Sequence, residues 1–304
     1  MTARRVLGAL LAAAVLAALP IGAYADPPSD DVYLSLGTSL AAGSLADPVG
    51  DTTFSSKWSY TDQLYQRIKG RVSPKLTHLK LGCPGETTGQ FTGGTNLFGQ
   101  PSACAGSYES GSQLGDALAA VEAGNVVLVT IDIGANDILQ TQQICQGEAT
   151  CISAVIPVIA QKVAEIMGAL RNDGGYTGPI VAMNYYNPQV AAAIGYFPGV
   201  AGQQEPDADL ALLSDQLTRG FNDALAGVYA TADAEVVDVY AALNAGDFGD
   251  DMPRNGIADN VDVVCALTSM CPDDVGVKAN IHLNEHGYRV VAKAFLEVLT
   301  DLED

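Results

Sequence analysis

Short apolar runs rich in β-branched residues alternate along the chain with longer segments whose apolar positions recur at helical spacing. The runs that predict strands are residues 32–36, 76–81, 126–133, 180–184 and 235–239, and the segments that predict helices are 58–68, 113–122, 152–171, 207–229 and 285–299. Strands of about four to eight residues that alternate with helices indicate crossover units, with a parallel sheet between two layers of helices. The pattern therefore predicts an α/β fold, and because no repeat or low-complexity linker interrupts it, we expect one domain.

The first residues of the chain follow a different pattern. Arg4 and Arg5 precede an apolar stretch at 6–19, and the segment ends in Ala-Tyr-Ala at 23–25. A positive start, an apolar run of about 14 residues and a small-residue end are the parts of a secretory signal peptide. We expect cleavage after Ala25, a secreted, extracellular protein, and a single catalytic domain at 26–304. The alternative is an uncleaved anchor helix, but the stretch is short for a membrane span and no later segment approaches that length, so no stable membrane anchor is expected.

The composition excludes two classes of protein. Against 35 Asp and Glu the 304 residues carry only 15 Lys and Arg, a formal net charge of −20, yet 48% of residues are hydrophobic and 16% are charged. A disordered acidic protein would contain far fewer apolar residues. A nucleic-acid-binding protein would need clustered Lys and Arg, and the sequence has no such run. We therefore expect a globular protein without a nucleic-acid partner.

Six cysteines fit an oxidising compartment. Fifteen pairings are formally possible, and the positions in the sequence favour three local ones, each around a loop with Gly, Ser or Asp: Cys83 with Cys104, Cys145 with Cys151, and Cys265 with Cys271. Zinc is the competing interpretation, but the sequence has no Cys-x-x-Cys and its three His lie far from most of the Cys. We therefore expect disulfides and no metal.

Two segments are long for loops of a compact domain, 88–111 and 241–274. The second contains seven Asp residues, five of them at 247–262, a composition that suits calcium. It lacks the ordered spacing of a calcium-binding loop. We expect a solvated surface loop joined by Cys265 and Cys271.

The residues that follow the predicted strands carry the candidate chemistry, because ligands of open parallel sheets bind beyond the carboxyl ends of the strands. Ser39 follows the first strand, Gly82 the second and Asn136 the third, and His282 lies near the C-terminus. Each alone has a structural explanation, such as a helix cap or a partly buried histidine. Of the other histidines, His78 falls inside a strand and His286 on the first turn of the last helix.

Together these residues suit acyl transfer, which needs a nucleophile, a base and donors for the oxyanion. Ser39 would attack an ester carbonyl, and His282 would take its proton and later protonate the leaving alcohol. The N–H groups of Ser39 and Gly82 and the side-chain amide of Asn136 would form the oxyanion hole.

With these residues in this order, the sequence resembles the SGNH (GDSL-type) serine esterases and lipases. The motifs are Gly-x-Ser-Leu at 37–40, the glycine at 82, Gly-x-Asn-Asp at 134–137, and His282 with Asn284 and Gly287-Tyr288 behind it. The resemblance covers essentially the whole mature chain and is closest in look to secreted actinobacterial members. It implies a three-layer α/β/α sandwich around a five-stranded parallel sheet in flavodoxin-like order.

The sequence departs from this family at two positions. Thr38 stands where the family usually has Asp, so the polar contact of that residue must differ. Ala279 stands three residues before the histidine, where the family commonly has the Asp that orients the imidazole. Three replacements remain open: a backbone carbonyl, the side chain of Asn280, or a carboxylate from Asp273 or Asp274. We favour the backbone carbonyl, because any well-placed acceptor can hold Nδ1–H.

The retained nucleophile, donors and histidine favour a carboxyl-ester hydrolase over a non-catalytic surface- or carbohydrate-binding module. A phospholipase or a carbohydrate deacetylase would use the same chemistry, because loops set the acyl and alcohol preference. We expect a small-molecule or lipid ester as substrate, no cofactor, and a monomer. The negative charge favours neutral esters over anionic ones.

Overall fold

The computed structural model describes residues 30–54, 57–251 and 253–301. The expected signal peptide at 1–25 lies outside these residues.

A five-stranded parallel sheet forms the centre of the fold, in the order β4-β1-β5-β6-β7. The strands are β1 Val32–Gly37, β4 Thr77–Lys80, β5 Val126–Asp132, β6 Ile180–Met183 and β7 Glu235–Val237. All five strands predicted from the sequence are present, with ends that differ by at most two residues. Numbered by appearance, the order is 2-1-3-4-5, the flavodoxin-like topology. The α/β/α fold class is therefore confirmed.

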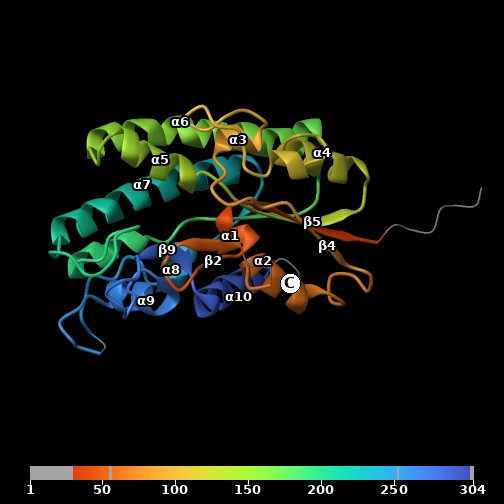
Figure 1. Ribbon diagram of the computed structural model, residues 1–304. Coiled ribbons are helices and arrows are strands. Elements are labelled where there is room, and N and C mark those ends of the chain that lie inside the picture. The colour runs from red at the N-terminus through yellow and green to blue at the C-terminus, as the bar shows by residue number, and fades with distance from the viewer. Residues whose placement is uncertain (1–29, 55–56, 252, 302–304) are drawn as a thin grey trace, which may run out of the picture.

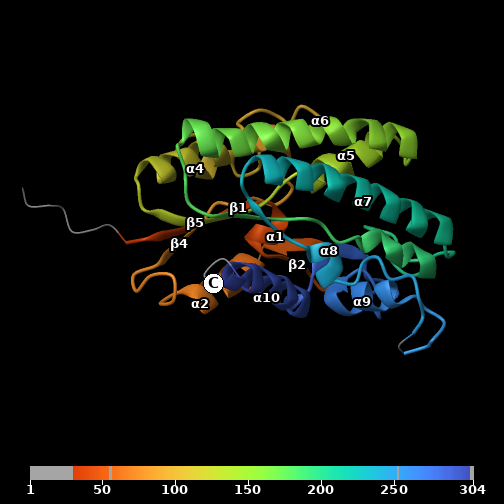
Figure 2. The same cartoon turned by 180° about the vertical axis from the view of Figure 1, so that it is seen from behind.

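Helices cover both faces of this sheet. They are α1 Ser39–Ala42, α2 Tyr60–Ile68, α3 Thr88–Phe91, α4 Gln113–Glu122, α5 Ala135–Ile144, α6 Ala149–Gly168, α7 Ala208–Thr231, α8 Val239–Ala242, α9 Asp259–Leu267 and α10 Glu285–Asp301, with helical turns at Ala105–Ser107, Ala169–Asp173 and Pro188–Ile194. Figures 1 and 2 show α4, α5, α6 and α7 on one side of the sheet and α2, α8, α9 and α10 on the other. The five helices expected from periodicity are all present.

Two short antiparallel pairs lie outside the main sheet. Strands β2 Ser44–Ala46 and β3 Thr52–Phe54 form a hairpin directly after α1, and β8 Thr268–Ser269 pairs with β9 Asn280–Leu283. The second pair contains His282. Neither pair was expected, because strands this short carry little periodic signal.

Helix α6 contradicts the expectation that no later segment reaches membrane-spanning length. With the turn that follows it, Ala149–Asp173 is 25 residues long and apolar enough to pass that test. One side of the helix, however, packs into the main hydrophobic core through Ile159, Val163, Ile166 and Met167. A core helix on a large sheet is apolar for this reason.

The two segments expected as loops contain regular structure. Residues 88–111 include α3, whose Phe91 is fully buried. Residues 241–274 include α9, which buries Val261, Val264 and Leu267 at helical spacing. The many Asp residues near these apolar positions made the helical spacing hard to recognise in the sequence. Asp at the start of a helix is favourable because the backbone N–H groups there carry partial positive charge.

All three expected disulfides are present. The Cα atoms are 6.1 Å apart in Cys83–Cys104, 5.7 Å in Cys145–Cys151 and 5.0 Å in Cys265–Cys271. Each bond joins two positions close in the sequence, and Cys83, which is fully buried, follows Gly82 directly.

The turn after β1 packs directly on the end of β5. Gly37 has a φ of +134°, and a Cβ atom there would lie 2.4 Å from the carbonyl oxygen of Asp132. Only glycine fits this approach. The side chain of Gln113 holds the turn from the other direction, because its amide nitrogen donates to the Gly37 carbonyl at 3.0 Å and its oxygen accepts from the Gly37 N–H.

The carboxylate of Asp132 holds the next residue of this turn. Its Oδ1 accepts from the N–H of Thr38 at 2.9 Å and from the Thr38 hydroxyl at 2.6 Å, and its Oδ2 accepts from the hydroxyl of Tyr60 at 3.0 Å. Burial raises the pKa of Asp132 to about 7, and the three donors oppose this shift. The carboxylate of this contact therefore comes from Asp132 of β5. Thr38, which stands where the family usually has Asp, supplies the hydrogen-bond donors.

This contact predicts the effect of two substitutions on stability. Thr38→Val removes the hydroxyl donor and leaves a buried carboxyl under-satisfied, so the free energy of unfolding should fall by about 1–3 kcal/mol. Thr38→Ser keeps the hydroxyl and should lose less than about 1 kcal/mol. Urea denaturation of both variants measures the difference, and equal losses would contradict a role for the hydroxyl.

Candidate active site

Ser39 is the first residue of α1, directly beyond the turn that Asp132 holds. Its side chain lines a cavity, and the residue is 9% exposed. The hydroxyl of this cavity-lining residue has no hydrogen-bond partner in the described part of the chain.

His282 lies on β9 and lines the same cavity. Its Nδ1 is 2.7 Å from Oδ1 of Asn280, and its own backbone N–H donates to the same oxygen at 3.0 Å. The amide nitrogen of Asn280 donates to the carbonyl of Gly50 at 2.9 Å and to the hydroxyl of Thr52 at 3.1 Å. Because the Gly50 carbonyl can only accept, the amide oxygen must face the imidazole.

This network determines the tautomer of His282. An acceptor at Nδ1 requires the proton to be on Nδ1, so Nε2 keeps its lone pair. Burial lowers the pKa of His282 to about 4, which also favours the neutral ring. The result is an imidazole with a free basic nitrogen.

The partner of Nδ1 differs from the one that we favoured from the sequence. The acceptor is the side chain of Asn280, and the expected backbone carbonyl is not used. Asp273 and Asp274 are exposed, in the loop before β9, and neither makes a hydrogen bond with His282 in the described part of the chain. The alternating orientation of residues in a strand explains this result, because residues 280 and 282 point to the same side of β9.

Asn136 lies at the start of α5 and also lines the cavity. Its amide nitrogen donates to the carbonyl of Glu86 at 3.0 Å. This bond uses one of the two N–H groups of the amide and determines its orientation, so the second N–H remains available to the cavity.

Gly82 is close to α1 but is not among the residues that line the cavity. A Cβ atom at this position would lie 2.7 Å from the Cβ atom of Ala41. The close approach of the β4 end to α1 therefore explains the glycine. Its N–H in an oxyanion hole stays a prediction.

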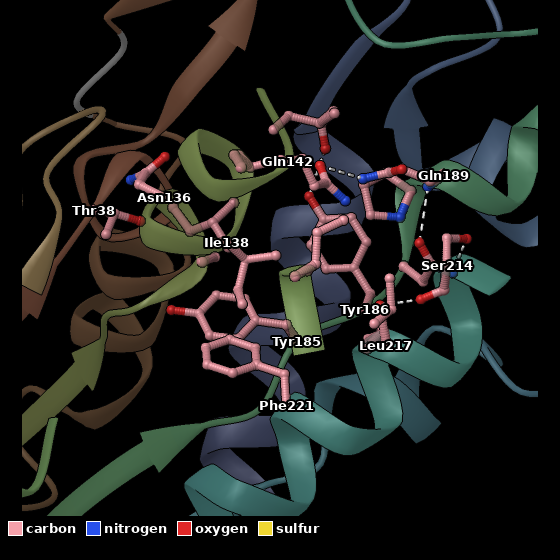
Figure 3. Close-up of a pocket in the computed structure, with 18 of the residues that line it drawn as sticks. Thr38, Asn136, Ile138, Gln142, Tyr185, Tyr186, Gln189, Ser214, Leu217 and Phe221 are labelled. Carbon is pink, nitrogen blue, oxygen red and sulfur yellow. Dashed lines mark hydrogen bonds between the residues drawn. The ribbon is translucent and has the colours of Figure 1, made fainter. Parts of the chain in front are cut away.

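We call the cavity lined by Ser39, Asn136 and His282 the catalytic cavity. Its walls are mostly apolar. Side chains from α5, α6 and α7 form them, with the aromatic rings of Tyr185 and Phe221 stacked 5.7 Å apart at one end (Figure 3). The apolar lining includes Ile138, Ile152, Ile156, Leu217 and Phe221. These wall residues could not be recognised from the sequence, because apolar positions at helical spacing look the same whether they face a core or a cavity.

The residues behind His282 hold β9 and α10 in place. Asn284 accepts from the N–H groups of His286 and Gly287, as a residue that caps a helix does. A Cβ atom at Gly287 would lie 2.1 Å from the carbonyl oxygen of Leu267. The hydroxyl of Tyr288 donates to the carbonyl of Ser44 at 2.7 Å. The family motif after the histidine is therefore structural.

A second serine and histidine pair lies elsewhere in the fold. Oγ of Ser35 is 2.8 Å from Nε2 of His78, and Nδ1 of His78 is 3.6 Å from Asp62. Ser35 is fully buried, and His78 stacks on Tyr33 with ring centroids 4.6 Å apart. No substrate can reach this serine, so the pair is part of the packing between β1, β4 and α2.

Over the described residues 30–54, 57–251 and 253–301, no group of three or more His, Cys, Asp or Glu side chains is arranged to hold a metal ion. The Asp residues of 241–274 instead make local hydrogen bonds, such as that from the N–H of Gly249 to Asp247 at 3.0 Å.

Solved structures with a similar fold include three ester hydrolases. An extracellular lipase from Streptomyces rimosus has 16% identity and a TM-score of 0.54, over 89% of this chain and 99% of that one. Phospholipase A1 from Streptomyces albidoflavus has 13% identity and a TM-score of 0.54, over 90% and 99%. A lipase from a goat rumen metagenome has 15% identity and a TM-score of 0.51, over 88% and 96%. At these identities the likeness shows the fold.

No curated protein matches this sequence. The sequence model of the GDSL-like Lipase/Acylhydrolase family matches residues 35–290, a range that includes Ser39, Asn136 and His282. Because this match covers most of the chain, the protein belongs to the GDSL-like lipase/acylhydrolase family and is a hydrolase that acts on esters.

Proposed function

We propose that the protein is an exported serine esterase or lipase that cleaves carboxylic esters through an acyl-enzyme on Ser39, with His282 as the general base. One observation carries the proposal: Ser39, Asn136 and His282 line a single cavity with mostly apolar walls. The free Nε2 of His282 gives this cavity a base, and the unbonded hydroxyl of Ser39 gives it a nucleophile.

The first half of the reaction forms the acyl-enzyme. Oγ of Ser39 attacks the ester carbonyl carbon while its proton moves to Nε2 of His282. The negative charge on the carbonyl oxygen is stabilised by the free amide N–H of Asn136 and by the N–H groups of Ser39 and Gly82. The carbon–oxygen bond to the alcohol then breaks, and the leaving oxygen takes the proton from Nε2.

The second half returns the enzyme to its starting state. Water attacks the acyl carbonyl and gives a proton to Nε2, and the acid leaves as Oγ regains that proton. Ser39 and His282 must come into contact for each transfer, and catalytic hydrogen bonds commonly tighten only when substrate is bound.

Asn280 takes the orienting role that a carboxylate has in the usual triad. Its amide oxygen holds the imidazole in the reactive tautomer, which is the geometric part of that role. A neutral amide does not add a full negative charge beside the imidazolium that forms during the reaction. Catalysis by this site therefore depends on geometry and on the oxyanion hole.

The cavity walls support an acyl chain longer than acetyl. Ile152, Ile156 and Phe221 come from two different helices and offer carbon atoms for an alkyl chain, each methylene of which gains about 0.8 kcal/mol on burial. A carbohydrate deacetylase would not need this surface. The net charge of −20 favours neutral substrates.

Three disulfides support export, because such bonds persist mainly in oxidising compartments. The signal-peptide pattern of the first residues supports the same proposal.

Replacement of the nucleophile tests the proposed function directly. Ser39→Ala should lower kcat/KM for p-nitrophenyl octanoate by at least about a thousandfold, and a phosphonate ester should label Ser39 in the parent only. Ser35→Ala is the matched control, since it removes the hydroxyl of the buried pair and should keep most activity. Turnover that survives Ser39→Ala would contradict the mechanism.

Asn280→Ala tests the orienting residue. Without the amide oxygen Nδ1 loses its acceptor, so we expect kcat to fall about tenfold to a hundredfold with KM nearly unchanged. Asp273→Ala and Asp274→Ala should each stay within about twofold of the parent. A large loss in either aspartate variant, with none in Asn280→Ala, would assign the role to a carboxylate.

The lowered pKa of His282 predicts the acid limb of the rate profile. The base works only as the neutral ring, so kcat/KM should stay level down to about pH 5 and halve near pH 4. A histidine with its ordinary pKa would lose half its activity near pH 6.5.

Stability must be followed in the same experiment, because burial also lowers the pKa of His78 to about 4. The unfolded chain takes up protons on His78 and His282 below about pH 6.5 that the native state refuses, so their contribution to stability is lost as the pH drops from about 6.5 to 4. Asp132 contributes with the opposite sign, because its raised pKa lets the native state take up a proton first, near pH 7. Circular dichroism at each pH separates unfolding from titration of the base. A midpoint near pH 6.5 in folded protein would contradict the prediction.

A further inference from the structure

A second, more open depression lies next to the catalytic cavity, and we call it the polar groove. The two share five lining residues: Leu139, Gln142, Gln189, Ile281 and His282. The rest of the groove is formed by residues 50–52, 198–199 and 278–280 and by Gln143. His282, the base of the proposed mechanism, therefore lines two neighbouring spaces.

The two spaces differ in polarity, because polar atoms form a larger share of the lining of the groove than of the catalytic cavity. Apolar side chains of α5, α6 and α7 dominate the catalytic cavity. The groove adds Gln143 and the ion pair of Asp51 and Lys278 to Gln142 and Gln189, which line both spaces. An ester has two unlike parts as well. An alkyl chain belongs in the first space, and a part with hydroxyl groups belongs in the second.

Gln142 and Gln189 form a pair at the boundary. The amide nitrogen of Gln189 donates to the amide oxygen of Gln142 at 3.0 Å, and Figure 3 shows this bond beside the catalytic cavity. Whichever way the two amides are turned, the pair leaves one NH₂ group and one carbonyl oxygen free. Vicinal hydroxyl groups, which both donate and accept, match such a pair.

The positions of the reacting groups place the alcohol part of the ester in the groove. The leaving oxygen takes its proton from His282, so the alcohol must lie beside this residue, while the carbonyl oxygen points to Asn136. With the acyl chain in the catalytic cavity, the groove is the space next to His282 that remains. We infer that the polar groove binds the alcohol part of the ester, and that this part is a neutral polyhydroxylated group such as glycerol or a sugar.

Charge in the groove supports a neutral group. Nζ of Lys278 lies 2.7 Å from Asp51, so the two charges of this wall compensate each other. An anionic headgroup would also meet the net charge of −20. The inference rests on the proposed function, because it takes His282 as the acid that protonates the leaving alcohol.

A set of esters with one acyl chain and different alcohols tests the inference. We would compare kcat/KM for methyl octanoate, 1-monooctanoylglycerol, 6-O-octanoylglucose and octanoylcholine, all below their critical micelle concentrations. The glycerol and glucose esters should exceed the methyl ester by about tenfold, the change expected from two neutral hydrogen bonds. Gln142→Leu should bring this ratio close to one, since it removes an amide of similar size.

Two further variants keep the test decisive. Gln143→Leu changes an exposed residue that lines only the groove, so it should lower the ratio even if Gln142→Leu does not fold. Gln66→Leu, an exposed position on α2, is the matched control and should keep the ratio.

Each outcome has a separate meaning. An equal rate for all alcohols, or a ratio that neither groove variant changes, would overturn the polar groove as the alcohol site. A preference for octanoylcholine would overturn a neutral polyol as its ligand. Failure of the proposed function would look different: no cleavage of methyl octanoate, or cleavage that persists in Ser39→Ala.

Discussion

The buried carboxylate of Asp132 is the constraint on which the position of Ser39 depends. It lies at the end of β5, opposite Gly37 at the end of β1. It accepts both the N–H and the hydroxyl of Thr38. A buried acid with donors around it is costly to move, because each donor would lose its partner away from water. The pairing of the two central strands therefore determines where the proposed nucleophile lies.

The position of His282, the proposed base, also depends on the segment after β1, through a series of contacts. Helix α1 leads into the β2–β3 hairpin, and the carbonyl of Gly50 in that hairpin orients Asn280, which in turn holds Nδ1 of His282. Tyr288 of α10 donates to Ser44 at the start of the hairpin. Ser39 and His282, about 240 residues apart in the sequence, are thus linked through the hairpin by the chain itself and by hydrogen bonds. The neutral side chain of Asn280 can orient the imidazole ring of His282, because orientation requires an acceptor for Nδ1–H and not a charge.

The proposed binding spaces for the two parts of an ester are formed by different elements. Helices α5, α6 and α7 form the apolar cavity, whereas the hairpin, β9 and the glutamines of α5 and of the turn Pro188–Ile194 form the polar groove. His282 lines both spaces. In the proposed mechanism the reacting groups therefore lie at the edge of the sheet, and the surrounding helices and loops select the substrate.

The sequence by itself determined the order of strands and helices, the three disulfides, and the positions of Ser39, Asn136 and His282 at strand ends or near the C-terminus. These follow from local periodicity and from short motifs, which need no knowledge of distant contacts. Only the tertiary structure decided that Asn280 pairs with Nδ1 of His282, that Thr38 meets Asp132, that α9 lies within an acidic segment, and which apolar helix faces line a cavity. Each of these depends on which residues meet across the fold, and a hydrogen-bond partner or a cavity wall is set by packing between segments far apart in the chain.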